Sequence, residues 1–137
     1  MGQQQLLLII LGVIVVGIAV AVGITMFTDN ATSANRDAVV NDLVNLSARA
    51  QQYYRRPTTL GGGGNVFTGC TLSDLVTVAS GATSYVNANG SYSIVGAVTD
   101  SLLTIQGEGN EIGNDGSGKV KVTMEVRAGR TQTTINN

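Results

Sequence analysis

The feature that most constrains this chain is an unbroken apolar segment from Leu6 to Phe27, LLLIILGVIVVGIAVAVGITMF. As a helix with a rise of about 1.5 Å per residue, the segment spans roughly 33 Å, enough to cross a bilayer core of about 30 Å. It carries no charge, and its many Leu, Ile, Val and Phe side chains favour membrane insertion by about 5 to 9 kcal/mol. The segment therefore predicts a helix that is surrounded by lipid or by other helices.

Three other interpretations of this segment are weaker. A cleaved secretory signal peptide has a shorter apolar core and a basic beginning, whereas Met1 to Gln5 contains no Lys or Arg. An N-myristoylation signal requires Ser or Thr at position 6, where this chain has Leu6. A buried core helix of a soluble domain is disfavoured because so short a chain cannot surround this much apolar surface.

Small residues interrupt the apolar segment at Gly12, Gly17 and Gly23. Gly17 lies four residues before Ala21, and Ala19 lies four residues before Gly23. Pairs with this spacing allow helix backbones to approach closely in an apolar medium, so they favour helix–helix contact. The alternative is that Gly is simply frequent in membrane helices.

An amphipathic segment follows the polar stretch Thr28–Asn35. We expect one helix to continue through that stretch, straight or with a bend there; the alternative is a second helix capped by Thr32 and Ser33. Between Ala34 and Tyr54, apolar residues recur at steps of three and four, as in a helix with one apolar face; they are Val39, Leu43, Leu46, Ala50 and Tyr53. The polar residues between them are Arg36, Asp37, Asn41, Asp42, Arg49 and Gln52. Pro57 is expected to end this helix.

The remainder of the chain is rich in Gly and Thr, and in several segments apolar and polar residues alternate as they do in strands. The clearest strand is Lys119–Arg127, in which alternate residues are apolar. Strands are also expected at Ser91–Val98 and Ser101–Gln106, joined by a turn at Thr99 and Asp100, and at Thr131–Ile135. Outside the sheet, we expect a connector that contains the glycine run 61–64 and a turn-rich loop over 107–118. We also expect a short helix within Thr71–Ser80, capped by Thr71 and Asp74 and ended by Gly81; the alternative for this segment is a strand.

The apolar face of the amphipathic helix and the apolar face of the sheet can cover each other. The predicted fold class is therefore α+β: a long N-terminal helix, first hydrophobic and then amphipathic, packed on a small antiparallel β-sheet head. The expected helix–sheet core contains Val39, Leu43, Leu46, Tyr53, Val120, Val122, Met124 and Val126. The predicted division of the chain is a polar leader at 1–5, a membrane and core helix at 6–27, an amphipathic helix at 28–56 and the head at 57–137.

Composition argues against an enzyme and predicts no cofactor and no small-molecule substrate. The chain has no His, and Cys70 is the single cysteine, so neither a zinc site of the usual kind nor a thiol–imidazole pair is available. We expect Cys70 to be a buried apolar residue; an intermolecular bridge and lipid attachment are the alternatives. The net charge of −1 does not favour nucleic acid as a partner.

Two further patterns are only weak evidence for a metal site or for glycosylation. The loop 107–118 contains oxygen ligands of the kind calcium prefers, but their spacing matches no EF-hand, so no metal site is predicted; they are Glu108, Asn110, Glu111, Asn114 and Asp115. Acceptor sequences for N-glycosylation occur at Asn30, Asn45 and Asn89, and such short sequences arise often by chance.

The order of a short leader ending in Gly2, an uncharged helix, an amphipathic helix and a sheet resembles the type IV pilin superfamily of pilins and pseudopilins. The residues that carry the resemblance are Gly2 before Gln3, the segment Leu6–Phe27, and ANRDAVVNDLVNLSARAQQYYRRP at 34–57. The resemblance implies cleavage by a membrane peptidase after Gly2, and Leu7 stands where many bacterial members carry Glu. It also implies an assembly helix, which would include Leu6, Leu11, Gly12, Val16, Gly17, Ala21, Gly23 and Phe27.

From this resemblance we expect a structural subunit of a type IV pilus-like extracellular filament. Its partners would be further copies of the chain in a helical filament, the cytoplasmic membrane before assembly, and the pilus assembly machinery. The alternative is a membrane-anchored pseudopilin or minor pilin of a secretion system, or a protein with one membrane span that presents a small β domain to a partner.

Overall fold

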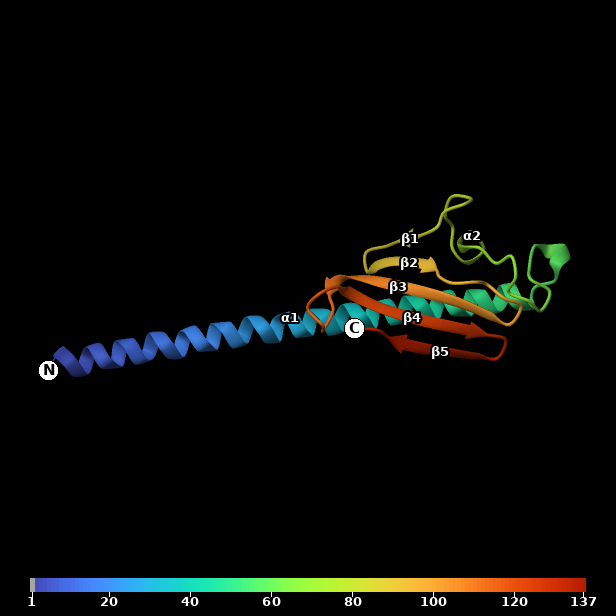
Figure 1. The fold of residues 1–137 in the computed structure, drawn as a ribbon. Coiled ribbons are helices and arrows are strands. Elements are labelled where there is room, and N and C mark those ends of the chain that lie inside the picture. Colours follow the sequence, from blue (N-terminus) through green and yellow to red (C-terminus); the bar gives the residue numbers. More distant parts are fainter. Residues whose placement is uncertain (1) are drawn as a thin grey trace.

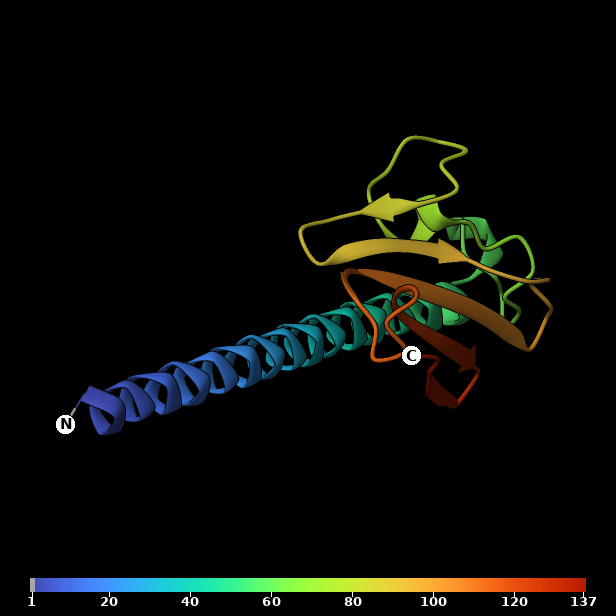
Figure 2. The same ribbon diagram turned by 60° about the vertical axis from the view of Figure 1, so that its left-hand side comes forward.

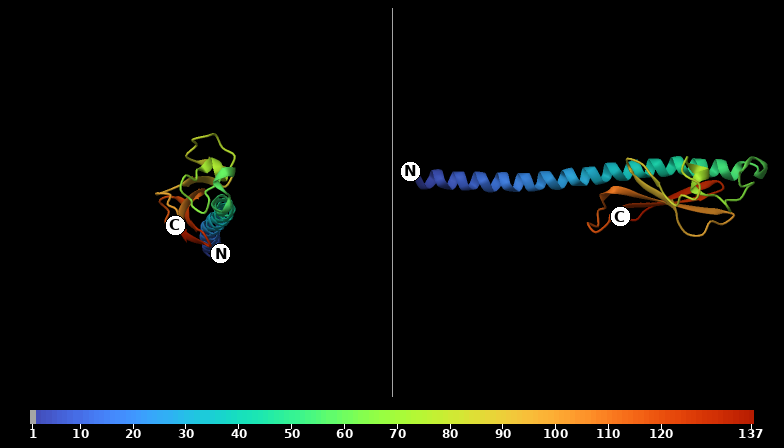
Figure 3. Two further views of the ribbon diagram at one scale, coloured as in Figure 1. Left: turned by 90° about the vertical axis from the view of Figure 1, so that its right-hand side faces the viewer. Right: turned by 90° about the horizontal axis from the view of Figure 1, so that it is seen from above.

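A computed structural model describes residues 2–137, and Met1, the first residue of the predicted leader, lies outside the described residues. Its dominant element is α1 (Gly2–Arg55), one helix of 54 residues. At about 1.5 Å per residue, this helix is about 81 Å long. It passes through 28–35 without interruption and curves gently, which confirms the expectation of one continuous helix (Figure 3).

The sheet is a five-stranded antiparallel meander in the order β1-β2-β3-β4-β5. Its strands are β1 (Tyr85–Val86), β2 (Gly90–Ile94), β3 (Leu102–Ile112), β4 (Lys119–Arg127) and β5 (Arg130–Ile135). The second half of α1 lies along one face of the sheet, while the first half projects beyond it (Figures 1 and 2). The predicted α+β layout of a long apolar helix and an antiparallel sheet is therefore confirmed.

The core lies between the second half of α1 and the sheet. All eight residues assigned to a helix–sheet core are buried there: Val39, Leu43, Leu46, Tyr53, Val120, Val122, Met124 and Val126. Phe67 and Cys70, from the segment between α1 and the sheet, close one end of this core. β4 has the bounds predicted from its alternation, and its apolar side chains face α1.

The prediction of a loop over 107–118 is wrong for its first half, because β3 continues to Ile112. Gly107 and Gly109 look like turn residues in the sequence, but here they allow α1 to lie close to the sheet. A Cβ atom on Gly107 would lie 2.7 Å from Cγ1 of Val39, and one on Gly109 would lie 2.0 Å from Oδ1 of Asn35. These glycines therefore mark a close approach within a strand.

Other boundaries also differ from expectation. β2 ends at Ile94 rather than Val98, and Gly96, in the following segment, has a φ of 75°. The short β1 was not predicted.

The helix expected within Thr71–Ser80 is only α2 (Leu72–Leu75), because Val76 and the β-branched residues after it adopt extended or irregular backbone. Its predicted capping by Asp74 is present, with the Thr71 N–H donating to Asp74 Oδ2 at 2.8 Å.

The glycine run at 61–64 forms a tightly folded connector. It follows the short 3₁₀ helix η1 (Thr58–Leu60) at the far end of α1, where Gly61 has a φ of 76°. A Cβ atom on Gly63 would lie 1.9 Å from the carbonyl oxygen of Val66, so only glycine fits there. The helix ends at Arg55, two residues before Pro57, as proline's steric restriction predicts.

Candidate functional site: the uncovered half of the long helix

The first half of α1 is not covered by any other part of residues 2–137. Every residue from Gly2 to Asn30 is exposed, and the large apolar side chains between Leu6 and Phe27 are 52% to 78% exposed. All the residues assigned to an assembly helix lie on this surface: Leu6, Leu11, Gly12, Val16, Gly17, Ala21, Gly23 and Phe27. We call residues 2–30 the uncovered half of α1.

The glycines of the uncovered half serve no packing purpose within one molecule. A Cβ atom added to Gly12, Gly17 or Gly23 would meet no atom within 4 Å. Their small size is therefore available for contact with something outside the chain.

The hydroxyl groups in this half are satisfied within the helix. Thr25 donates to the carbonyl oxygen of Ala21 at 3.0 Å, and Thr28 donates to that of Ile24 at 2.9 Å. An apolar environment penalises polar groups without partners, and these two hydroxyls avoid that penalty. The uncovered half is thus compatible with apolar surroundings as far as Asp29, the first charged residue of the chain.

The boundary between the uncovered half and the head is fixed by polar side chains of α1. Thr32 donates to the carbonyl oxygen of Ile112 at 3.0 Å. Asn35 donates to the carbonyl oxygen of Asn89 at 2.9 Å and accepts from the N–H of Asn110 at 3.1 Å. These bonds satisfy backbone groups of β3 and of the β1–β2 turn, and they set where along α1 the sheet begins.

Two turns further, Asp42 joins α1 to the β1–β2 hairpin. Its Oδ2 atom accepts hydrogen bonds from Asn87 at 2.8 Å, from Asn89 at 2.8 Å and from the Tyr92 hydroxyl at 2.7 Å. Burial by itself raises the pKa of the Asp42 carboxyl, but the bonds from Tyr92, Asn89 and Asn87 together outweigh burial and hold that pKa below its ordinary value. Burial and the bond to Asp42 raise the pKa of Tyr92. Asp42 is therefore an ionised anchor.

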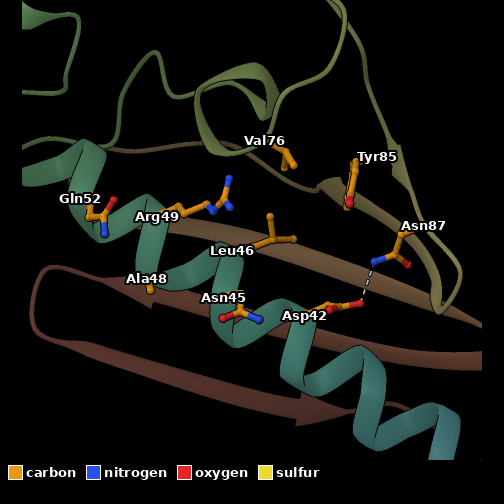
Figure 4. Close-up of a pocket in the computed structure, with 9 residues that line it drawn as sticks. All are labelled: Asp42, Asn45, Leu46, Ala48, Arg49, Gln52, Val76, Tyr85 and Asn87. Atoms are coloured by element: carbon orange, nitrogen blue, oxygen red, sulfur yellow. Dashed lines mark hydrogen bonds between the residues drawn. The ribbon is translucent and has the colours of Figure 1, made fainter.

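A groove of about 500 Å³ runs beside this cluster, between α1 and the segment that leads into β1 (Figure 4). Asn45, Gln52 and Tyr85 are among its lining residues, and Leu46 forms its floor. Arg49 spans part of it and donates to the carbonyl oxygen of Leu75 at 2.9 Å. Because Asp42 and Arg49 are both engaged in holding the fold, the groove offers no free acid–base pair.

Residues that could carry other chemistry are dispersed. Within residues 2–137, no group of three or more His, Cys, Asp or Glu side chains is arranged to hold a metal ion. Glu108 lies in β3, whereas Asp115 lies in the following loop, where the N–H of Ser117 and the amide of Asn137 hold the pKa of its carboxyl below the ordinary value. Cys70 is buried as predicted, and burial, with a smaller effect of the Asp74 charge, raises the pKa of its thiol to about 12.

The three sequons differ in their accessibility. Asn30 and Asn45 are exposed on α1, whereas the side-chain amide of Asn89 donates to Asp42. The side chain of Asn89 is therefore engaged in a hydrogen bond in the folded chain, unlike that of an exposed acceptor.

Asn35, Asp42 and Tyr92 were not predicted as contacts. In the sequence, Asp42 and Arg49 are among the polar residues that separate the apolar positions, whereas in the structure both side chains bond to the edge of the head. The missed signal is spacing: Asn35, Asp42 and Arg49 are seven residues apart, which places them along one line of a helix, beside the apolar stripe.

Comparison of this chain with models of known protein families, with curated proteins and with solved structures finds no match.

Proposed function

We propose that this chain is a structural subunit of a type IV pilus-like filament that polymerises through the uncovered half of α1. The observation that carries the proposal is that residues 2–30 are exposed throughout, although a folded head with its own core follows on the same helix. Burying each large apolar side chain is worth about 1.5 to 3 kcal/mol. The uncovered half therefore requires lipid or protein around it.

Two apolar environments are open to this half of the helix. Before assembly it spans the cytoplasmic membrane, and after assembly it packs against the same half of other copies in the filament core. Apolar burial would hold that core together, while Gly12, Gly17 and Gly23 would let neighbouring backbones approach closely. The heads would then face outward on the cell surface, and the assembly machinery would move subunits from one environment to the other.

The second candidate is a protein that remains in the membrane, either a pseudopilin of a secretion system or a one-span protein that presents its β head to a partner. The observation that favours it is that α1 alone is long and apolar enough to cross a membrane, with a mean hydropathy of 3.2 over its most apolar stretch. A single span requires no other copy.

Electron microscopy of material sheared from the surface of cells that express the intact chain separates the two candidates. The filament proposal predicts long fibres of uniform width in which this chain is the major component. Recovery of the chain only in the membrane pellet, at normal expression, contradicts it. Amino-terminal sequencing of the sheared protein also tests cleavage after Gly2, which predicts that Gln3 comes first.

A further inference from the structure

The head carries exposed arginines at the end farthest from the amino terminus, which we call the distal end. Figure 1 shows the end of α1 and the turn between β4 and β5 at this end. Its exposed arginines are Arg55, Arg56, Arg127 and Arg130. Among residues 2–137 the one ion pair within 4.0 Å joins Arg127 to Glu125, at 3.4 Å. The other three arginines therefore have no carboxylate partner in the described chain.

The acidic residues near the distal end are engaged elsewhere. Asp74 accepts from the N–H and the hydroxyl of Thr71, and Asp100 accepts from the hydroxyl of Thr68. Neither carboxylate lies within 4.0 Å of a distal arginine, so Arg55, Arg56 and Arg130 stay available for contacts outside the molecule.

The opposite, proximal end of the head, where the uncovered half of α1 emerges, is acidic. Asp29 on α1 and Glu111 near the end of β3 are both exposed. Asp29 lines a notch of about 620 Å³ together with Ile112 and Asn114. Asp115 adds a third carboxylate in the β3–β4 loop. The cations at this end are Lys119, at the start of β4, and the half-buried Arg36, which donates to the carbonyl oxygen of Asn137. The exposed carboxylates of the proximal end are thus opposite in charge to the exposed arginines of the distal end.

Each end also exposes a large apolar side chain. Leu60 in η1 is 71% exposed at the distal end, and Ile112 is 59% exposed beside the proximal notch. An apolar contact and a charged contact are therefore available at both ends.

The two halves of α1 have similar lengths. The uncovered half, residues 2–30, is about 43 Å long, and the half within the head, residues 31–55, is about 37 Å long. A second copy that is parallel to the first and displaced by roughly one head length would lay its uncovered half beside the head half of the first helix. Its head would then begin where the first head ends. Along that head half, Ala34, Val44 and Ala48 are exposed and leave room for a neighbouring helix.

We propose that heads stack end to end in the filament, with the distal arginines Arg55, Arg56 and Arg130 of one copy against the proximal acids Asp29 and Glu111 of the next copy. This inference rests on the proposed filament function and specifies its partner surface as a second copy of the same chain. Opposite charges on the two ends also oppose antiparallel stacking, because that would bring like charges together. The contact thus selects the parallel arrangement that a filament with one polarity requires.

Charge reversal in the intact chain tests the contact. One variant carries Arg55→Glu and Arg56→Glu, a second carries Asp29→Lys and Glu111→Lys, and a third carries all four changes. Each of the first two variants is expected to reduce filament yield at least tenfold. The third, in which the charges are exchanged, is expected to recover to within about threefold of the unaltered chain. Thr134→Glu, in β5 opposite Thr123 and on the face of the sheet away from α1, is the control and is expected to leave the yield unchanged.

The amount of chain in the membrane and its tyrosine circular dichroism show whether each variant still folds. Unchanged yield in both two-residue variants would overturn the stacking contact and leave the filament function intact. Loss of yield in both without recovery in the exchanged variant would also overturn it, since the arginines would then serve a different partner. If the unaltered chain forms no filament, the proposed function fails and the stacking contact fails with it.

Discussion

The Asp42 carboxylate receives three hydrogen bonds from the β1–β2 hairpin through a single oxygen atom. Hydrogen bonds to a charged group are stronger than those between neutral groups. Because Asp42 lies beside the apolar stripe of α1, these bonds fix the rotation of the helix on the sheet. Tyr92 contributes both to this cluster and to the apolar core.

Replacing Asp42 with Asn should lower the stability of the head by about 1 to 3 kcal/mol, because the three donors lose a charged acceptor. Thermal unfolding of the intact chain in detergent micelles, followed by the near-ultraviolet circular dichroism of the tyrosines, measures this change. Asp37→Asn makes the same charge change on an exposed part of the same helix, so it should have little effect. Equal losses in the two variants would contradict the role of Asp42.

The same cluster predicts a dependence on pH. The pKa of Asp42 is lower in the folded chain than its ordinary value of 3.8, so protonation favours the unfolded chain. The contribution of Asp42 to the stability of the head is therefore complete above pH 3.8 and is lost as the pH falls through the pKa of Asp42 in the folded chain. The stability difference between the unaltered chain and Asp42→Asn should narrow below pH 3.8, and a constant difference down to pH 2 would contradict this explanation.

Gly107 is one of the residues at which β3 lies close to α1, and replacing it with Ala should destabilise the head by about 1 to 3 kcal/mol. The added Cβ would lie 2.7 Å from Val39 and 3.0 Å from the Tyr92 ring, so the helix would have to move away from the sheet. Gly129→Ala is the control, since a Cβ there meets no atom within 4 Å. Unfolding of both variants under the same conditions measures the difference, and equal stability would contradict the close approach.

At the scale of elements, regular patterns and the apolar contact between helix and sheet were predictable from the sequence, whereas the polar contacts and close backbone approaches between elements were not. The length of α1 follows from apolar periodicity up to Pro57, and β4 follows from its strict alternation. β3 was predicted too short because Gly107 and Gly109 are common in turns, and only the approach of α1 explains them in a strand. Asp42 was missed for a similar reason: its partners lie 45 to 50 residues away in the chain.

The uncovered half of α1 gives a prediction at this scale. Gly17→Leu should reduce filament yield while leaving the amount of chain in the membrane unchanged, because the larger side chain obstructs close helix packing but favours lipid. Val13→Leu adds one methylene group at a position that is already large, so it should be tolerated. Filaments in the sheared fraction and chain in the membrane fraction are quantified for both variants. Unchanged filament yield from Gly17→Leu would count against close packing at this residue.

At the scale of the whole molecule, a single helix joins two surfaces with different requirements. Its second half is covered by the sheet of the same chain, and its first half is covered by no other segment of the part of the chain that the structure describes (Figure 1). The head therefore folds around its own core, whereas the first half depends on its surroundings. In the proposed filament, this division would let one subunit be stored in a membrane and then used in an assembly without refolding of the head.

The most direct test of this account is the mass of the intact chain by light scattering after detergent has been removed. The filament proposal predicts assemblies many times heavier than the 14.1 kDa chain, because copies must cover each other's apolar helices. Addition of detergent should return them to small particles with an intact head. A stable, monodisperse monomer of 14.1 kDa in detergent-free buffer would contradict the central claim.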